Sequence, residues 1–198
     1  MKKQTIALVS ATAILGGNAL LSSSVLADDT STPVSSDAKV EFTAPDPGEE
    51  GALSLTAVPA IDFGSQEISA QDKSYTAQGD AHLTIQDNRG TAPGWHVNVS
   101  ASNFVTASGK ELKGTTITFA NGAITSNDET SKVEAQKIEI TPGGTASTAL
   151  NATVGNGNSE TDELFSAKAI QLNVPGSSSK VSDKYTSTMT WSLVDAPL

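Results

Sequence analysis

The chain has 198 residues, with 12 basic and 22 acidic side chains and a formal net charge of −10 at pH 7. This acidic balance argues against nucleic acids and anionic lipid surfaces as binding partners. Because the chain contains no cysteine, disulfides cannot support the fold and no lipid can be attached through a thiol, which excludes a disulfide-rich scaffold and a lipoprotein.

Residues 1–27 have the pattern of a signal peptide. Lys2 and Lys3 precede an interrupted apolar run from Ile6 to Leu21, and the small-residue end Val25-Leu26-Ala27 predicts cleavage after Ala27. An uncleaved anchor is the alternative, but the run is broken and shorter than the about 20 apolar residues that a membrane-spanning helix needs. Cleavage removes two basic residues and no acid, so the mature charge becomes −12 (10 minus 22). We expect a secreted chain that does not span the membrane and has no covalent surface anchor.

Residues 28–50 are expected to form a flexible leader. The segment is acidic and rich in Ser, Thr and Pro, and it includes the run Asp46-Pro47-Gly48-Glu49-Glu50. Such a composition buries too little apolar surface to offset the conformational entropy that is lost on ordering. The remaining residues, 51–198, are numerous enough to form one domain with a full core.

Residues 51–198 consist of short alternating runs that are typical of β-strands. The clearest are Trp95 to Ala101, in which every second side chain is apolar, and Tyr185 to Leu193, in which Tyr185, Met189, Trp191 and Leu193 share one side. Further strands are expected around Leu83–Ile85, Ile117–Phe119, Ile138–Ile140 and Ile170–Val174. With the Gly, Asn and Pro clusters between them, these runs predict an all-β, Greek-key-like β-sandwich of about eight to ten strands.

Two local features refine this expectation. Asn121-Gly122 stands between two apolar runs and predicts a β-hairpin, because Asn-Gly suits the tightest hairpin turns. Val133–Lys137 and Glu163–Ala169 are the two candidates for a short helix. Both lie among Gly-rich breakers, so strand or loop is favoured at each.

Few side chains point to catalysis or metal binding. His82 and His96 lie in alternating runs and are expected on the solvated surface, and the sequence has no metalloprotease, nucleotide-loop or nucleophile-elbow motif. Residues 156–163 offer oxygen ligands at alternating positions, which suits weak Ca²⁺ binding, but they lack EF-hand spacing and a solvated acidic loop is favoured. We therefore expect no enzymatic activity, no cofactor and no metal.

Both tryptophans occur in the same short pattern. The first is Trp95-His96-Val97, and the second is Thr190-Trp191-Ser192-Leu193, which follows Tyr185 and precedes Asp195-Ala196-Pro197. The second segment resembles the C-terminal signature of the WxL family of Gram-positive surface proteins. In that family a Tyr precedes a Thr-Trp-x-Leu strand, and an Asp-x-Pro segment follows it.

Two other segments extend the resemblance from Gly51 to the end of the chain. Gly51 to Leu55 with Ile61-Asp62-Phe63-Gly64 is similar to the family's start, and Asp87-Asn88-Arg89-Gly90 is similar to its middle. One position departs from the pattern, because Val97 stands where Leu is usual. The exchange keeps an apolar strand residue and changes little.

The resemblance implies a domain that binds peptidoglycan without a covalent link, often together with other WxL proteins and a membrane-anchored partner. The residues expected to contact the wall or a partner are Trp95, Val97, Tyr185, Trp191 and Leu193. The residues themselves leave two roles open. An indole on a strand can fill the core or, when partly exposed, stack on a sugar and donate a hydrogen bond.

Two other functions remain as alternatives at this stage. An adhesin would use the same rigid scaffold to bind a host extracellular-matrix protein. A glycan-active enzyme would need two carboxylates about 5 to 10 Å apart, and the sequence does not single out such a pair.

Overall fold

The structure is a computed structural model that describes residues 39–40 and 52–198. The expected signal peptide at 1–27 lies outside the described residues, as does the expected leader at 28–50 except for Lys39 and Val40. The described domain is built from strands and a single 3₁₀ turn, η1, which confirms the all-β class. The strands are β1 (Leu53–Ala57), β2 (Lys73–Thr76), β3 (Ala81–Asp87), β4 (Trp95–Ala101), β5 (Thr116–Phe119), β6 (Ala123–Ser126), β7 (Val133–Ala135), β8 (Ile138–Ile140), β9 (Ser147–Ala152), β10 (Ser159–Phe165), β11 (Ile170–Val174) and β12 (Met189–Val194).

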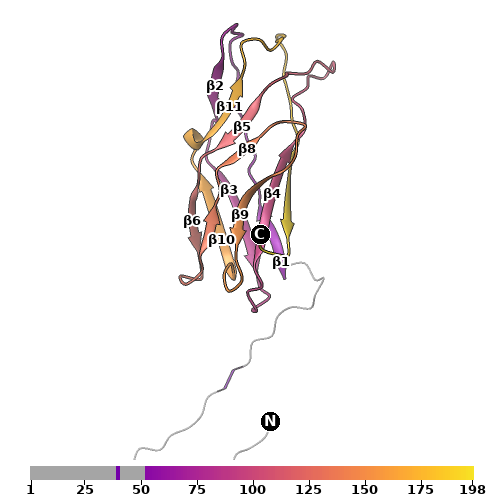
Figure 1. Ribbon diagram of the computed structural model, residues 1–198. Helices are drawn as coiled ribbons and strands as arrows, with labels where there is room; N and C mark the ends of the chain where they lie inside the picture. The colour runs from indigo at the N-terminus through magenta and orange to yellow at the C-terminus, as the bar shows by residue number, and fades with distance from the viewer. Residues whose placement is uncertain (1–38, 41–51) are drawn as a thin grey trace, which may run out of the picture. The chain divides into compact units, whose positions relative to one another are not determined.

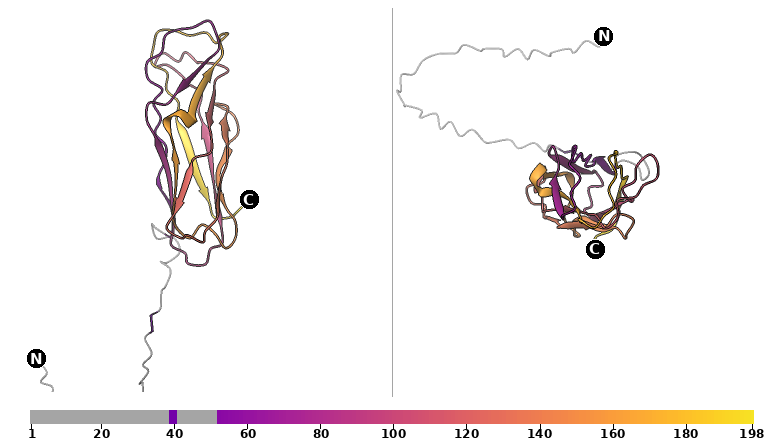
Figure 2. Two further views of the ribbon diagram at one scale, coloured as in Figure 1. Left: turned by 90° about the vertical axis from the view of Figure 1, so that its left-hand side faces the viewer. Right: turned by 90° about the horizontal axis from the view of Figure 1, so that it is seen from above.

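The twelve strands form three antiparallel sheets of four. Sheet A has the order β1-β3-β10-β6, sheet B has β2-β11-β5-β8, and sheet C has β12-β4-β9-β7. Strands that are consecutive in the chain always belong to different sheets in the described domain, so every ladder joins distant segments. This crossing pattern agrees with the expected Greek-key-like sandwich. Seen from above, the strands surround a common interior (Figure 2).

Sheets A and B are two halves of one bent surface (Figure 1). The pairs β2–β3, β5–β6 and β10–β11 are each interrupted by only a few residues, and each pair continues from one sheet into the other. Backbone hydrogen bonds span the interruptions, from Ala77 N to Ile170 O at 3.1 Å and from Ala120 N to Ala169 O at 2.9 Å. These breaks raise the strand count above the eight to ten that the sequence predicts.

The hairpin predicted at Asn121-Gly122 is wrong. β5 pairs with β8 and β11, whereas β6 pairs with β10, so the dipeptide bends a strand from sheet B into sheet A. Asn121 Nδ2 donates to Ala135 O at 3.2 Å, and Gly122 N donates to Glu163 Oε1 at 2.9 Å. A Cβ on Gly122 would lie 2.6 Å from Glu163 Cγ. Glycine therefore permits a close approach here and does not serve a tight turn.

The preference for strand or loop over helix is confirmed at both candidate segments. Val133–Ala135 is β7, and Glu163 lies near the end of β10. Only Ala167–Ala169 winds into the 3₁₀ turn η1, at the level where β10 gives way to β11.

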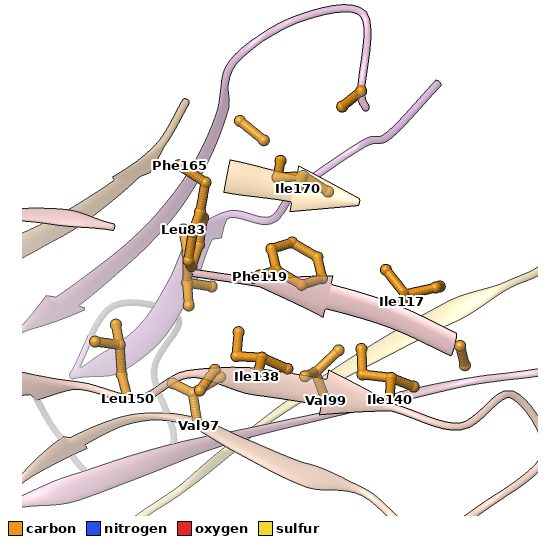
Figure 3. Packing of buried hydrophobic residues seen from close by; sticks show 14 of the residues in the cluster. Leu83, Val97, Val99, Ile117, Phe119, Ile138, Ile140, Leu150, Phe165 and Ile170 are labelled. Atoms are coloured by element: carbon orange, nitrogen blue, oxygen red, sulfur yellow. The ribbon is translucent and has the colours of Figure 1, made fainter. Parts of the chain in front are cut away.

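The core is one cluster of buried apolar side chains contributed by all three sheets. Figure 3 shows Phe119 of sheet B, beside its ladder partner Ile138, above Val99 of sheet C, so the bent surface packs on the inner side of sheet C. The rings of Phe119 and Phe165 meet edge to face, with centroids 5.2 Å apart. This geometry suits the aromatic quadrupoles and adds to the burial of apolar area.

One acidic side chain lies within this core. Glu163 has no exposed surface, and its cross-strand neighbours are Leu83 and Ile124. Its Oε1 accepts the Gly122 N–H, but its Oε2 has no hydrogen-bond partner among the described residues. Burial raises the pKa of Glu163 to about 7, and the charge of Asp162 adds to this rise while the Gly122 hydrogen bond opposes it.

This raised pKa predicts a pH-dependent stability. The folded state holds the Glu163 proton more tightly than the unfolded state, in which the pKa is near 4.5. The stability linked to this proton is therefore complete below about pH 4.5 and is lost as the pH rises through about 7. We expect the Tm of the wild type to fall between pH 5 and pH 8 by several degrees more than that of Glu163→Gln. Equal slopes for the two proteins in thermal melts would show that Glu163 is not the group responsible.

Candidate functional site

The two tryptophan motifs lie on neighbouring strands. β4 carries Trp95 and Val97, and its antiparallel partner β12 carries Trp191 and Leu193. In this ladder Leu193 pairs with Val97, and Trp191 pairs with Val99. The fold thus brings together four of the five residues that the sequence singles out, from segments almost one hundred residues apart.

All four of these side chains face the interior. Trp95 and Val97 have no exposed surface, so in this structure they present nothing to a ligand. Trp191 and Leu193 are half-buried and pack against the same core. The Trp191 ring meets Phe119 edge to face, with centroids 6.2 Å apart and an interplanar angle of 89°. Between the two roles open to an indole, the geometry places Trp95 in the core and Trp191 at its margin.

A glycine-containing loop closes over the Trp95 indole. Trp95 Nε1 donates to Gly157 O at 2.9 Å, and Gly157 N donates to Ser131 Oγ at 2.7 Å. Gly157 has φ +81°, and a Cβ at this position would lie 2.4 Å from Trp95 Nε1. Both the backbone conformation and the available space therefore require glycine.

This loop begins the segment that the sequence offered as a weak Ca²⁺ site, and the side chains of that segment point in different directions. Asn156 Oδ1 accepts the Lys132 N–H at 2.7 Å. From Ser159 onward the segment is β10, whose side chains alternate between faces, so Glu160 is exposed while Glu163 is buried. Within 39–40 and 52–198, no three His, Asp or Glu side chains gather where they could hold a metal ion.

The middle and C-terminal motif segments meet at Arg89. The Arg89 guanidinium donates to both carboxylate oxygens of Asp87, at 2.9 and 2.8 Å, and also to Gly94 O at 3.2 Å. It also forms an ion pair with Asp195. The Asp87 side chain has no exposed surface, and its hydrogen bond with Arg89 is the main reason why the pKa of Arg89 is raised. We call this arrangement the Arg89 clamp.

The segment after the clamp lies across the ends of β4 and β9. His96 Nδ1 is 2.6 Å from Ala196 O and must carry the proton there, because a carbonyl only accepts. Leu198 N donates to Asn151 Oδ1 at 3.0 Å. His96 thus lies on the polar side of its strand, as expected, but it is only partly exposed and is hydrogen-bonded.

Tyr185, the fifth predicted residue, is set apart from the motif pair. Its hydroxyl accepts the Val181 N–H at 3.0 Å, and its half-buried ring packs at the edge of the core. The next residue, Thr186, forms an isolated bridge with Val105. Tyr185 thus fixes the loop that leads into β12.

The opposite side of sheet C is polar, and we call it the outer face. It carries the middle residue of each motif, His96 and Ser192, because neighbouring strand residues point to opposite sides. In the ladders, His96 pairs with Asn151, and Asn151 pairs with Glu134. The other outward side chains are Asn98, Ser100, Thr148, Thr190 and Val194.

The outer face is hollowed along β9, where β7 of the same sheet and β8 of sheet B border it. This groove has a volume of about 570 Å³ and is lined by Glu134, Gln136, Lys137, Glu139, Ser147, Thr148, Asn151 and Leu198. The sequence did not reveal it, since its lining comes from three strands, from the β7–β8 connection and from Leu198, and from no motif. The only available signal is that these strand residues are polar and alternate with buried ones.

His82 is the other histidine, and it lies on the outward side of sheet A. Its side chain is 55% exposed, as expected, and Nδ1 is 3.0 Å from Asp162 Oδ2. Thr84 Oγ1 donates to Asp162 Oδ1 at 2.8 Å. The Thr84 hydroxyl is thus held by the carboxylate and not by the imidazole, and the cluster lacks the nucleophile-to-base contact of a catalytic triad.

Comparison with known proteins gives one match. A family model described as WxL domain, surface cell wall-binding, matches residues 26–197. No curated protein and no solved structure matches the chain. In the part of the chain that the structure describes, no helix has the length and apolar character needed to cross a bilayer.

The Arg89 clamp predicts that two substitutions differ greatly in their effect on the free energy of unfolding. Arg89→Ala leaves the buried Asp87 carboxylate without its partner and should lower the free energy of unfolding by about 3 to 5 kcal/mol. Asp195→Asn removes an ion pair whose carboxylate is 67% exposed, so it should cost less than about 1 kcal/mol. Urea unfolding of the two variants measures both values. Similar losses would contradict the role assigned to Asp87.

The burial of the motif residues predicts which of two tryptophan substitutions lowers the stability more. Trp95→Ala removes a fully buried indole and should cost about 3 to 5 kcal/mol or prevent folding. Trp191→Ala should cost clearly less, because the ring is only half-buried. Denaturant midpoints of the two variants test the order, and a larger loss for Trp191→Ala would contradict the placement of Trp95 in the core.

Proposed function

The chain belongs to the WxL family of surface cell wall-binding domains, and on that premise we propose that it is a secreted, non-catalytic protein that binds peptidoglycan without a covalent bond. The observation that carries the proposal is the family match over residues 26–197. The geometry supports it, because the motif segments that lie far apart in the sequence converge on the β4–β12 pair and the Arg89 clamp.

The charge of the chain suggests how this binding works. The mature chain would carry a charge of −12 (10 minus 22), and peptidoglycan stem peptides carry carboxylates. Net electrostatic attraction therefore cannot drive association, and hydrogen bonds and apolar contacts must supply the affinity. Salt screens repulsion between like charges, so it should not release the protein.

The same family membership supports a proposal about partners. We infer that the domain assembles on the wall with other WxL proteins and with a membrane-anchored partner. β12 supports this inference, because it is an edge strand of sheet C and presents backbone groups that an added strand could pair with.

Wall extraction tests the proposed binding mode. The wall-bound fraction of the full chain should stay constant or rise as the salt concentration increases, and a denaturant that spares covalent bonds should release the protein. Release by salt alone would indicate ionic attachment. Retention after complete denaturation would indicate a covalent link and overturn the proposal.

Pull-down experiments separate this function from its alternatives. Purified peptidoglycan should retain the protein, whereas immobilised extracellular-matrix proteins should not. The reverse preference would favour an adhesin. Release of soluble fragments from peptidoglycan by the purified protein would favour a glycan-active enzyme.

A further inference from the structure

We propose that the groove on the outer face of sheet C is the wall-contact site, and that it binds the N-acetylated glycan strand and not the stem peptides. This inference rests on the proposed function and assigns that function to residues. It also assigns core packing and ligand contact to different side chains of the motif strands. The inward side chains build the core, and the outward side chains line the contact surface.

Asn151 is the first observation that points to a ligand. Its side chain is 7% exposed, and it is one of the residues that line the groove. The Leu198 N–H requires an acceptor, which fixes Oδ1 toward Leu198 and sets the orientation of the amide. The Asn151 NH₂ group then has no hydrogen-bond partner among the described residues. This nitrogen keeps some accessible surface, so it can donate to water or to a ligand in the groove.

A bulge in β9 places a second polar group beside this amide. Val97 pairs with Leu150 and Asn98 pairs with Thr148, so Ala149 is an extra residue in the ladder. Without the bulge, Thr148 and Asn151 would point to opposite faces, because three positions separate them. With it, both line the groove, and Thr148 Oγ1 donates to Asn98 Oδ1 at 3.1 Å.

The charges around the groove select the class of ligand. Glu134 and Glu139 are exposed carboxylates that line the groove, and Lys137 is the single ammonium among the lining residues. Carboxylates accept strong hydrogen bonds from hydroxyl groups and repel other carboxylates. A polymer of N-acetylated sugars offers hydroxyl donors to these residues and acetamide carbonyls to the Asn151 NH₂ group. A stem peptide would bring its own carboxylates against Glu134 and Glu139.

The motif residues act on this groove as positioning residues. Leu198 holds the Asn151 amide, and Leu198 follows the segment that the Arg89 clamp and His96 fix to the end of β4. The clamp, the tryptophan strands and the groove thus form one continuous arrangement across sheet C.

Two probes and two groove variants test the proposal. The full chain is titrated with purified peptidoglycan sacculi and with a soluble N-acetylglucosamine polymer that carries no peptide. Asn151→Asp retains the acceptor for Leu198, replaces the NH₂ donor with an acceptor oxygen and adds one negative charge, so we expect binding to both probes to weaken by at least about tenfold. The matched control is Asn127→Asp, which makes the same charge change at an exposed loop residue and should bind as the wild type does.

The second variant, Glu134→Ala with Glu139→Ala, alters only exposed side chains and therefore leaves the core intact. It removes two negative charges. General electrostatics predicts stronger binding to an anionic wall, whereas recognition in the groove predicts weaker binding to both probes. The control is Glu160→Ala, an exposed carboxylate on sheet A.

The outcomes separate this inference from the function it rests on. Failure of the wild type to bind sacculi would overturn the proposed function itself. Wild-type binding that persists unchanged in both groove variants would overturn the groove assignment only. Binding to sacculi but not to the peptide-free polymer would overturn the choice of glycan over stem peptide. Loss in both groove variants, with both controls binding normally, supports the inference.

Discussion

The arrangement of the whole site depends on the pairing of β4 with β12. Two properties of strands determine what this pairing does, because side chains alternate between faces and paired residues lie side by side. Since Leu193 pairs with Val97, both motifs turn their large apolar residues to the interior and their middle residues to solvent. A shift of one residue in the register would exchange the two faces and expose the tryptophans.

The motifs of the family acquire a physical meaning from this pairing. In Trp-x-Leu the two apolar residues are two positions apart, which places both on the same side of a strand. The pattern therefore indicates that both side chains pack in the core. The Asp87–Arg89 segment and Asp195 meet in the clamp, which joins the end of β12 to the start of β4. Under the proposed groove assignment, wall binding depends on the motifs through the surface they hold in place.

Much of the fold could be predicted from the sequence because local alternation determines it. The strands β4, β11 and β12 follow from period two alone, as does the burial of Val97, Val99 and Leu172. The sheet order could not be predicted, because no two consecutive strands of the described domain pair and the register arises from distant contacts. Asn121-Gly122 illustrates the limit, since its hairpin chemistry is overridden by the strand that β5 and β6 share and by its contact with Glu163.

The candidate site could be predicted only in part for the same reason. The motif residues were visible, and their convergence on neighbouring strands was compatible with the pattern. The exposure of these residues could not be predicted, because an amphipathic ring fits a core and a binding surface equally well. The groove could not be predicted from the sequence, since it depends on a bulge at Ala149 and on the contact between Leu198 and Asn151. No local pattern encodes these two features.

Fluorescence quenching of Trp95 tests the central claim most directly. In Trp191→Phe, which retains an aromatic ring against Phe119, Trp95 is the only remaining tryptophan. With Trp95 in the core, its emission should be blue-shifted and protected from acrylamide, and sacculi should leave both properties unchanged. A Trp95 that acrylamide quenches in the free protein, and that becomes protected only when sacculi bind, would contradict the claim.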